Sequence, residues 1–351
     1  MVVLVVLLWI IGGYIVYLLL QKKTVISEIG TPLSSSKDVF ATNLSAIRIK
    51  HPVLIELKTT LQQHIVGMDG FINGLLVALL VKGHVLVEWV PGLAKTKTLH
   101  VLAHLLWLDF SRIQFTPDML PSDIVWVDIY DSKTKTFENH AGPIFAHFVL
   151  ADEINRATPK VQSALLEAMQ EKQVTLGGKT MPLPDPFFVM ATQNPLEHEG
   201  TYPLPEAQLD RFLCKILVDY PSAQEEKDIL DVVSDVAPSI KKILSIKELH
   251  TLQDASREIG ISNDVKEYIV DLVQKTRVKD PRVLYGVSPR WSLSIMYAAQ
   301  ALALLTGKDC VTKTEVDQVA LLVMRHRIVL QYQSKLQWYT EDSVLIDMLS
   351  A

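Results

Sequence analysis

The chain has 351 residues, 49% of them hydrophobic, which excludes a disordered protein and predicts two packed domains plus an appendage. The formal net charge is -5, from 34 basic and 39 acidic residues, so we expect no nucleic acid partner. The two cysteines, Cys214 and Cys310, lie too far apart in sequence for a zinc or redox motif, and we expect both to be buried, reduced thiols.

The N-terminus begins with an uncharged apolar run, Val2 to Leu20. At about 1.5 Å per residue this run is long enough to cross roughly 30 Å of hydrocarbon. Its apolarity on every face favours a membrane helix over a buried core helix, and it lacks the basic start and cleavage site of a signal peptide. Lys22 and Lys23 place the remainder on the cytoplasmic side. We therefore expect residues 1–21 to be a single-pass helix in the cell membrane.

Residues 22–50 are polar and contain Gly30 and Pro32, as expected of a linker. Residues 51–221 then alternate helical apolar spacing with short apolar runs, which predicts a parallel sheet covered by helices. The predicted helices are Leu54–Ile65, Phe71–Leu80 and Pro159–Glu171, and the predicted strands are His84–Glu88, Ala146–Ala151 and Phe187–Ala191.

From residue 222 the strand signals stop, and residues 222–351 are predicted to form a separate helical domain. Its predicted helices are Gln224–Val233, Ser262–Arg277, Ser288–Thr306 and Lys313–Leu330.

A candidate phosphate-binding loop, Trp89–Thr96, follows a predicted strand and precedes a predicted helix. Its backbone N–H groups would hold anionic oxygens at the helix N-terminus. Lys95 would reach the terminal phosphates, and the Thr96 hydroxyl would ligate Mg²⁺. The loop departs from the general glycine pattern at Trp89 and at Ala94.

Two adjacent carboxylates, Asp152 and Glu153, end the apolar run that precedes them. An isolated pair of this kind is often a solvated strand end. After a lysine-threonine loop, however, Asp152 is expected to hold the metal and Glu153 to polarise the water that attacks the γ-phosphate.

The strings GPIFAHFVLADEINRATPKVQSALLEAMQEKQVT and FFVMATQNP closely resemble the MoxR family of AAA+ ATPases, and the resemblance spans roughly Leu54 to Leu330. It implies a P-loop αβα core with a parallel sheet, an all-α lid, and the cofactors ATP and Mg²⁺. The family loop commonly reads GVPGLAKT, so only Trp89 departs from it. The implied nucleotide-binding residues are Ile65, Val66 and Gly67 on the adenine side, and Trp89, Val90, Pro91, Gly92, Leu93, Ala94, Lys95, Thr96 and Lys97.

The resemblance also implies catalytic roles. Asn194 is similar to the residue that positions attacking water, Arg211 to the arginine finger and Arg290 to the second sensor carried by the lid. Arg156 is a second choice for an interface arginine, its alternative role being a salt bridge. A finger that acts on a neighbouring subunit implies a ring, and a hexamer is the family expectation.

The implied function is chaperone-like remodelling of a protein client, in this family often with a partner that bears a von Willebrand factor A domain. Two polar hairpin candidates, Asp131–His140 and Gln173–Met181, would contact the client or serve as plain surface loops. One alternative is a catalytically degenerate membrane scaffold, if Trp89 is genuine. Another is a motor subunit like that of magnesium chelatase, although QFTPDMLPSDI and ATQNP favour MoxR.

Tryptophan stands at several positions where the resemblance or a turn favours glycine. The chain has 15 glycines, fewer than the usual share of about 7%, and six tryptophans. We hypothesise that the source organism reads UGA as glycine, and that the gene was translated with a genetic code in which UGA means tryptophan. The alternative is that the tryptophans are genuine and fill space in the core. The six positions are Trp9, Trp89, Trp107, Trp126, Trp291 and Trp338.

Overall fold

The structure is a computed structural model that describes residues 52–65, 67–89, 95–131, 136–176, 179–194, 200–232, 241–277 and 280–350. The predicted membrane helix, residues 1–21, and the predicted linker, residues 22–50, lie outside these residues. None of the helices in the described ranges is both long and apolar enough to cross a membrane.

A five-stranded sheet forms the centre of the first domain, and all of its neighbouring strands are parallel. The strand order is β2-β5-β8-β1-β9. The strands are β1 (Val85–Trp89), β2 (Phe110–Gln114), β5 (Phe148–Asp152), β8 (Phe188–Gln193) and β9 (Cys214–Val218). The three predicted strands are present, whereas β2 and β9 were not predicted. Because the strands are parallel, all their carboxyl ends lie at one edge of the sheet and all their amino ends at the other.

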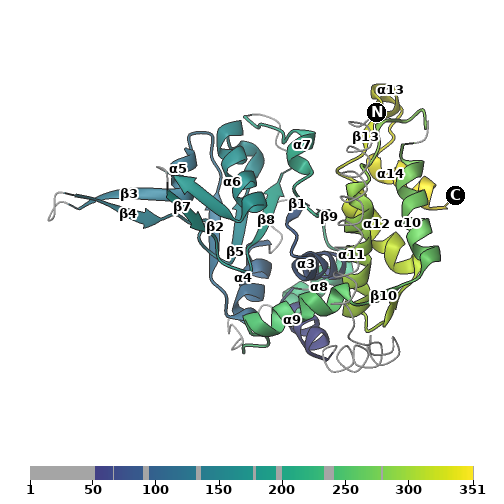
Figure 1. Ribbon diagram of the computed structural model, residues 1–351, viewed down its shortest axis with the longest axis horizontal. Coiled ribbons are helices and arrows are strands. Elements are labelled where there is room, and N and C mark those ends of the chain that lie inside the picture. The colour runs from purple at the N-terminus through teal and green to yellow at the C-terminus, as the bar shows by residue number, and fades with distance from the viewer. Residues whose placement is uncertain are drawn as a thin grey trace, which may run out of the picture. The chain divides into compact units, whose positions relative to one another are not determined.

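Helices cover both faces of this sheet (Figure 1). Phe148 and Leu150 of β5 pack into one core, while Val149 and Ala151 pack into a second core on the opposite face. This two-residue alternation explains why β5 is apolar at every position before its end. The helices of this domain include one at residues 52–64, followed by α3 (Asp69–Val81), α4 (Lys95–Leu106), α5 (Pro121–Val125), η1 (Ile154–Arg156), α6 (Pro159–Glu171) and α7 (Glu206–Leu209).

Two antiparallel hairpins interrupt the sheet topology, and both were predicted. One pairs β3 (Trp126–Asp131) with β4 (Thr136–Ala141), and the other pairs β6 (Gln173–Leu176) with β7 (Lys179–Pro182). In Figure 1 the β3–β4 hairpin extends beyond the central sheet.

The second domain is helical, as predicted, and packs on the first through α11, which contacts α3, and through α12, which contacts β9. Its helices are α8 (Ala223–Val232), α9 (Ile246–Arg257), α10 (Asn263–Lys275), α11 (Arg290–Leu305), α12 (Lys313–Met324), α13 (Tyr332–Leu336) and α14 (Glu341–Ser350).

Three details of the sequence analysis are wrong. The strand signals were expected to stop at residue 222, but β10 (Gly260–Ile261) pairs with β12 (Cys310–Val311), and β11 (Val283–Tyr285) pairs with β13 (Val329–Leu330). The helix predicted to reach Leu330 ends at Met324, because the chain turns there into β13. Cys214 is buried as expected, but Cys310 is exposed because the two residues of β12 face opposite sides, and Val311 is the one that is buried.

Trp107 and Trp338 occupy backbone conformations that favour glycine. Their φ angles are 53° and 65°, in the left-handed region, and each follows the end of a helix. In both turns the next residue's N–H closes the helix: Leu108 donates to Ala103, and Tyr339 donates to Ser334. This is the Schellman arrangement, in which glycine commonly takes the left-handed position. By contrast, Trp126 is extended and Trp291 is helical, so the structure supports the glycine hypothesis at only two of these four positions.

Replacing Trp107 or Trp338 with glycine is expected to raise the free energy of unfolding by about 1 kcal/mol at each site. Both side chains are exposed, by 71% and 92%, so little packing is lost. Denaturant unfolding of the full chain in detergent measures the change. Trp126→Gly is the control, because it removes a ring pair with Phe145 and places glycine in a strand. That control should destabilise the chain, and destabilisation by both Trp107→Gly and Trp338→Gly would contradict the account.

Candidate active site

Asp152 is a buried carboxylate at the carboxyl end of β5, with a side chain only 1% exposed. The Thr192 hydroxyl on β8 donates to its Oδ1 atom at 2.7 Å. On the other oxygen, Oδ2, it accepts from Arg112 on β2, at 2.6 Å from Nη2 and 3.2 Å from Nε. A buried carboxylate requires a compensating positive charge, and here a guanidinium supplies it.

Glu153 has a φ of 58°, in the left-handed region that a glutamate rarely adopts. Its N–H donates to the Thr192 hydroxyl at 2.9 Å, so one threonine fixes both acidic residues. Its Oε2 atom accepts from Gln114 Nε2 at 2.8 Å and pairs with Arg156 Nε at 2.9 Å. Gln114 in turn accepts from Arg112, which also holds Asp152, so a chain of hydrogen bonds through β2 joins the two carboxylates. For Arg156, the ion pair is the role that the structure shows.

The lysine-threonine segment begins helix α4, which follows β1 after residues 90–94. Lys95 and Thr96 are the first two residues of α4, and the Thr96 side chain is partly buried while that of Lys97 is exposed. Trp89 is the last residue of β1 and pairs with Val218 of β9. The rest of the predicted loop, residues 90–94, lies outside the described residues, as does Val66.

The carboxyl edge therefore brings together β1 and β5, which end in the predicted site residues Trp89 and Asp152, and β8, which a predicted site residue follows. Asn194 follows β8 directly and is partly buried. Ligands of open parallel sheets bind beyond the carboxyl edge, at the place where the order of the strands reverses. Here the order reverses at β1, because the chain passes from β8 over β1 to β9. The donor set fits a magnesium-bound triphosphate: a buried carboxylate and a hydroxyl for the metal, and a helix N-terminus for the phosphates.

A cavity of about 280 Å³ lies at the same edge, beside the end of β9. Gly67, with a φ of 73°, lines it together with Phe71, Tyr220 and Pro221. Gly67 belongs to the predicted adenine-side strip, whereas Ile65 of that strip is buried in the core. Phe71, Tyr220 and Pro221 give this cavity aromatic and apolar walls beside the carboxyl edge.

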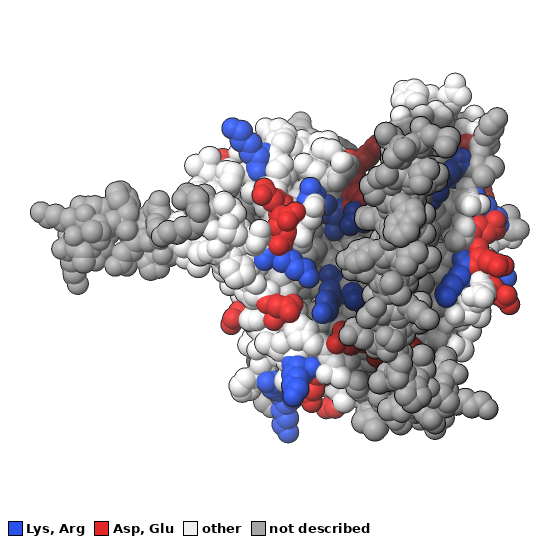
Figure 2. All heavy atoms as spheres, in the orientation of Figure 1, with Lys and Arg blue, Asp and Glu red and all other residues white. Residues whose placement is uncertain are grey.

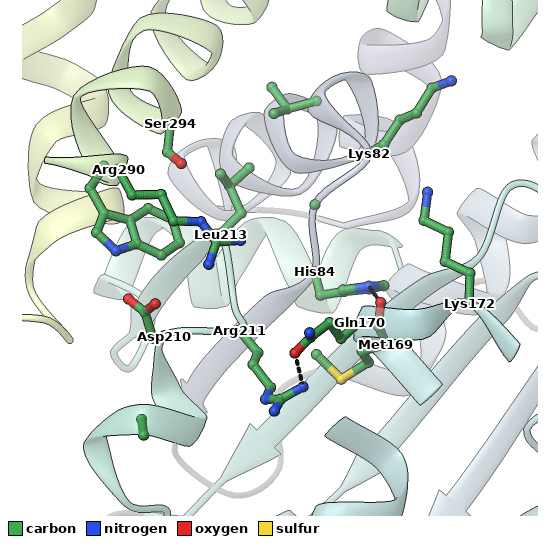
Figure 3. Close-up of a pocket in the computed structure, with 14 residues that line it drawn as sticks. Lys82, His84, Met169, Gln170, Lys172, Asp210, Arg211, Leu213, Arg290 and Ser294 are labelled. Atoms are coloured by element: carbon green, nitrogen blue, oxygen red, sulfur yellow. Dashed lines mark hydrogen bonds between the residues drawn. The ribbon is translucent and has the colours of Figure 1, made fainter. Parts of the chain in front are cut away.

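Arg211 and Arg290 do not lie at this edge. Both line a second cavity of about 390 Å³, whose other residues include His84 and Leu213, which directly precede strands β1 and β9 (Figure 3). The second cavity is therefore at the amino edge of the sheet. Arg211 Nη1 donates to the Leu166 carbonyl at 3.1 Å and to the side chain of Gln170 on α6.

The second cavity carries positive charge. Lys82 and Lys172 line it opposite Arg211 and Arg290, with Asp210 as the acidic member. His84 contributes no charge at neutral pH, because burial lowers its pKa to about 4. Its Nδ1 atom accepts the Val189 N–H at 3.1 Å, which leaves Nε2 as the donor to the Met169 carbonyl. On the face shown in Figure 2, by comparison, basic and acidic side chains are interspersed over the described surface.

Three residues at the site were not predicted: Arg112, Gln114 and Thr192. Arg112 and Gln114 lie on β2, for which no strand was predicted, so nothing placed them beside Asp152. Thr192 lies in the ATQNP string, two residues before Asn194, and its position near the end of β8 was the available signal.

The parallel sheet, the acidic pair at its carboxyl edge and the helical second domain define an ATPase of the AAA+ class. Residues 84–214 match the family model of ATPases associated with various cellular activities (AAA), and residues 275–345 match the AAA lid domain. The chain belongs to the MoxR family of AAA+ ATPases. It is an ATP hydrolase that uses ATP and Mg²⁺.

Similar proteins agree with this assignment. The chain is 49% identical over 278 residues to the chaperone MoxR1 of Mycobacterium tuberculosis, which covers 77% of this chain and 74% of that protein. It is 47% identical to the uncharacterized protein YeaC of Bacillus subtilis, with 86% and 94% covered. A crystal structure of a protein from Cytophaga hutchinsonii that is assigned as an ATPase superposes with a TM-score of 0.79 at 38% identity, covering 92% of this chain and 98% of that one.

Proposed function

We propose that this chain is a subunit of a ring-shaped motor that uses ATP hydrolysis to remodel a protein client. The observation that carries the proposal is that the acidic pair and Arg211 lie at opposite edges of the central sheet. Asp152 and Glu153 lie at the carboxyl edge of the sheet, and Arg211 lies at the amino edge, on the far side of strands such as the five-residue β9. A strand of that length spans roughly 16 Å. Because this is more than an arginine side chain spans, Arg211 would complete the site of a neighbouring subunit.

The roles at the carboxyl edge follow from the contacts there. Asp152 and the Thr96 hydroxyl would hold Mg²⁺, which supplies positive charge to the phosphates when bound. Lys95 would place its charge on the terminal phosphates. Glu153, held by Gln114 and Arg156, would accept the proton of the attacking water, and Asn194 would orient that water.

Arg290 shares the second cavity with Arg211, although it comes from the helical domain. Both arginines are exposed, as required of side chains that meet a neighbouring molecule. We infer that the two act on the same neighbouring nucleotide, Arg211 as finger and Arg290 as second sensor.

A hexamer is the expected ring. Purified full chain in detergent should give a mass of six subunits in the presence of Mg²⁺ and ATP, measured by light scattering with the detergent contribution subtracted. One surface of each subunit would meet a different surface of the next, and such contacts form a ring when the rotation from subunit to subunit closes. A chain that stays monomeric with nucleotide at assay concentrations would contradict the ring.

The client is proposed to be a protein, in accord with the chaperone name of MoxR1, and a partner with a von Willebrand factor A domain is the expected kind. The β3–β4 and β6–β7 hairpins are the candidate contact elements. Cross-linking of the full chain with ATP, followed by mass spectrometry, would locate the contacts. If no cross-link to a client falls on either hairpin, the hairpins are not the elements that contact the client.

We also propose that residues 1–21 tether the motor to the cell membrane, with the ATPase domain in the cytoplasm. The support is the uncharged run from Val2 to Leu20. Leu7→Lys with Ile11→Lys should move the chain from the membrane pellet to the soluble fraction, because each lysine costs about 2.5–3.5 kcal/mol at the centre of a membrane helix. Leu7→Ala with Ile11→Ala is the matched control and should stay in the pellet. Retention of the lysine variant in carbonate-washed membranes would count against the tether.

A further inference from the structure

Arg327 is a buried arginine just beyond the end of α12, with a side chain only 3% exposed. Its guanidinium reaches out of the helical domain to the segment that precedes β9. Nη1 donates to the Leu213 carbonyl at 3.2 Å, Nη2 donates to the Phe212 carbonyl, and Nε donates to Asp210 Oδ1 at 3.3 Å. These three partners occupy positions 210, 212 and 213, immediately on both sides of Arg211.

One side chain thus fixes the backbone around the proposed finger. Phe212 is fully buried, so its carbonyl has no water to accept from and depends on protein donors. His326, which precedes Arg327, lies 3.2 Å from the same carbonyl through Nε2. Burial lowers the pKa of Arg327 to about 9, which still leaves the guanidinium charged at neutral pH. A charge held at this depth needs acceptors on several of its N–H groups, and the finger segment supplies three of them.

Arg327 also contacts Trp291, a residue of the helical domain that lines the second cavity. Its Cζ atom lies 3.1 Å from the ring centroid of Trp291, the residue after Arg290. The chain neighbours of both exposed arginines therefore meet at one guanidinium. Within the described part of the chain, the Arg211 side chain donates its hydrogen bonds to α6 of its own domain, and Arg290 lies over the ring of Trp291 in its own helix. Arg327, in contrast, contacts both segments.

We propose that Arg327 is a positioning residue for trans-acting catalysis: it ties the Arg211 segment to the helical domain, so that Arg211 and Arg290 face the neighbouring subunit as one rigid pair. The proposal rests on the proposed function of Arg211 as a finger. It predicts that loss of Arg327 harms turnover at the neighbouring site while leaving nucleotide binding in its own subunit intact, because its contacts are at the amino edge.

A double-mutant cycle on kcat of the full chain tests this. Arg327→Met should lower kcat roughly 10- to 100-fold, the effect of misplacing a catalytic group by about 1 Å. In the Arg211→Ala background the same substitution should lower kcat by a much smaller factor, because the finger is already gone and only the placement of Arg290 remains to be lost. The dissociation constant of a fluorescent ATP analogue should change less than about twofold, because an arginine from the neighbouring subunit stabilises the transition state and contributes little to binding of ATP in the ground state.

Arg325→Met is the matched control. Arg325 is also largely buried, lies two residues away and is ion-paired at 3.0 Å, but its partner is Asp342 in α14. If Arg327 merely stabilises the helical domain, Arg325→Met and Arg327→Met should lower the melting temperature and kcat alike, and Arg327→Met should lower kcat by the same factor with and without Arg211.

Asp210→Asn provides a second variant in case Arg327→Met fails to fold. Asp210 is 39% exposed, so its replacement is milder, and it weakens only the Nε contact. A several-fold loss of kcat that disappears in the Arg211→Ala background supports the proposal, whereas equal losses in both backgrounds overturn it. If Arg211→Ala alone keeps wild-type kcat, the finger assignment fails first and this proposal fails with it. If Arg211→Ala lowers kcat as expected, but Arg327→Met lowers kcat by the same factor with and without Arg211, only the positioning role of Arg327 is refuted.

Discussion

Arg211→Ala is expected to lower the kcat for ATP hydrolysis by roughly 10³-fold, the lower range for loss of an arginine finger. In the proposed site its own subunit's nucleotide would lie at the opposite edge of the sheet, so the affinity for ATP should stay unchanged. The folded state should also tolerate the change, because Arg211 is exposed and, in the described part of the chain, its side chain donates hydrogen bonds to Leu166 and Gln170 of α6. Steady-state phosphate release by the full chain in detergent gives kcat, and a binding titration gives the affinity.

Two comparisons sharpen this prediction. Arg211→Lys should also lose most of the activity, because lysine lacks the planar fork of a guanidinium. Arg257→Ala should keep full activity, since Arg257 is an exposed arginine of α9 that stacks over Tyr297 and meets neither edge of the site. Wild-type kcat for Arg211→Ala would show that another group neutralises the transition-state charge.

Glu153→Gln is expected to stop hydrolysis, with a loss of about 10²- to 10⁴-fold in kcat, while ATP binding is retained. The amide keeps an oxygen that can accept from Gln114 and Arg156, so the local structure should persist. What it loses is the ability to take a proton from water. Single-turnover hydrolysis, measured beside equilibrium binding of ATP, separates these effects.

Glu171→Gln, at the end of α6, is the matched control, because it removes an exposed glutamate in the same domain without touching the acidic pair. It should behave as wild type. Normal turnover by Glu153→Gln would mean that the general base has been misassigned, and loss of binding would mean that the substitution disrupts the phosphate site as a whole.

Three strands of the sheet, β1, β5 and β8, and the acidic pair could be predicted because their signals are local. The run from Phe148 to Ala151 is apolar at every position since both faces of β5 are covered, and Asp152 marks its end. The Thr96 position follows from the order of strand, loop and helix. Short strands such as β10 and β12 carry no such signal, because two residues are too few to show a period.

The partners of the site residues could not be predicted, because they come from pairings distant in sequence. Arg112 reaches Asp152 only because β2 lies beside β5 in parallel register. The placement of Arg211 and Arg290 at the edge opposite the acids likewise depends on the whole sheet topology. The motif resemblance gave those two arginines roles, and only the fold shows that both lie away from their own subunit's acids.

The tryptophans show both limits of a sequence argument. The glycine hypothesis places tryptophan where a turn would favour glycine, and Trp107 and Trp338 do adopt left-handed backbone conformations. At Trp291 the same reasoning gives no such turn, since this residue is helical and lies beneath Arg327. Composition and resemblance could not separate these cases, because the backbone angle depends on where each helix ends.

Mixing two inactive variants tests the central account most directly. The Glu153→Gln chain keeps its arginines and the Arg211→Ala chain keeps its acids, so co-expressed rings contain interfaces that pair the intact acids of one with the intact arginine of the other. Random assembly in equal amounts would form such interfaces at about a quarter of positions. The account predicts that the mixed rings regain ATP turnover, up to about that fraction of wild type. Mixed rings no more active than either variant alone would contradict it.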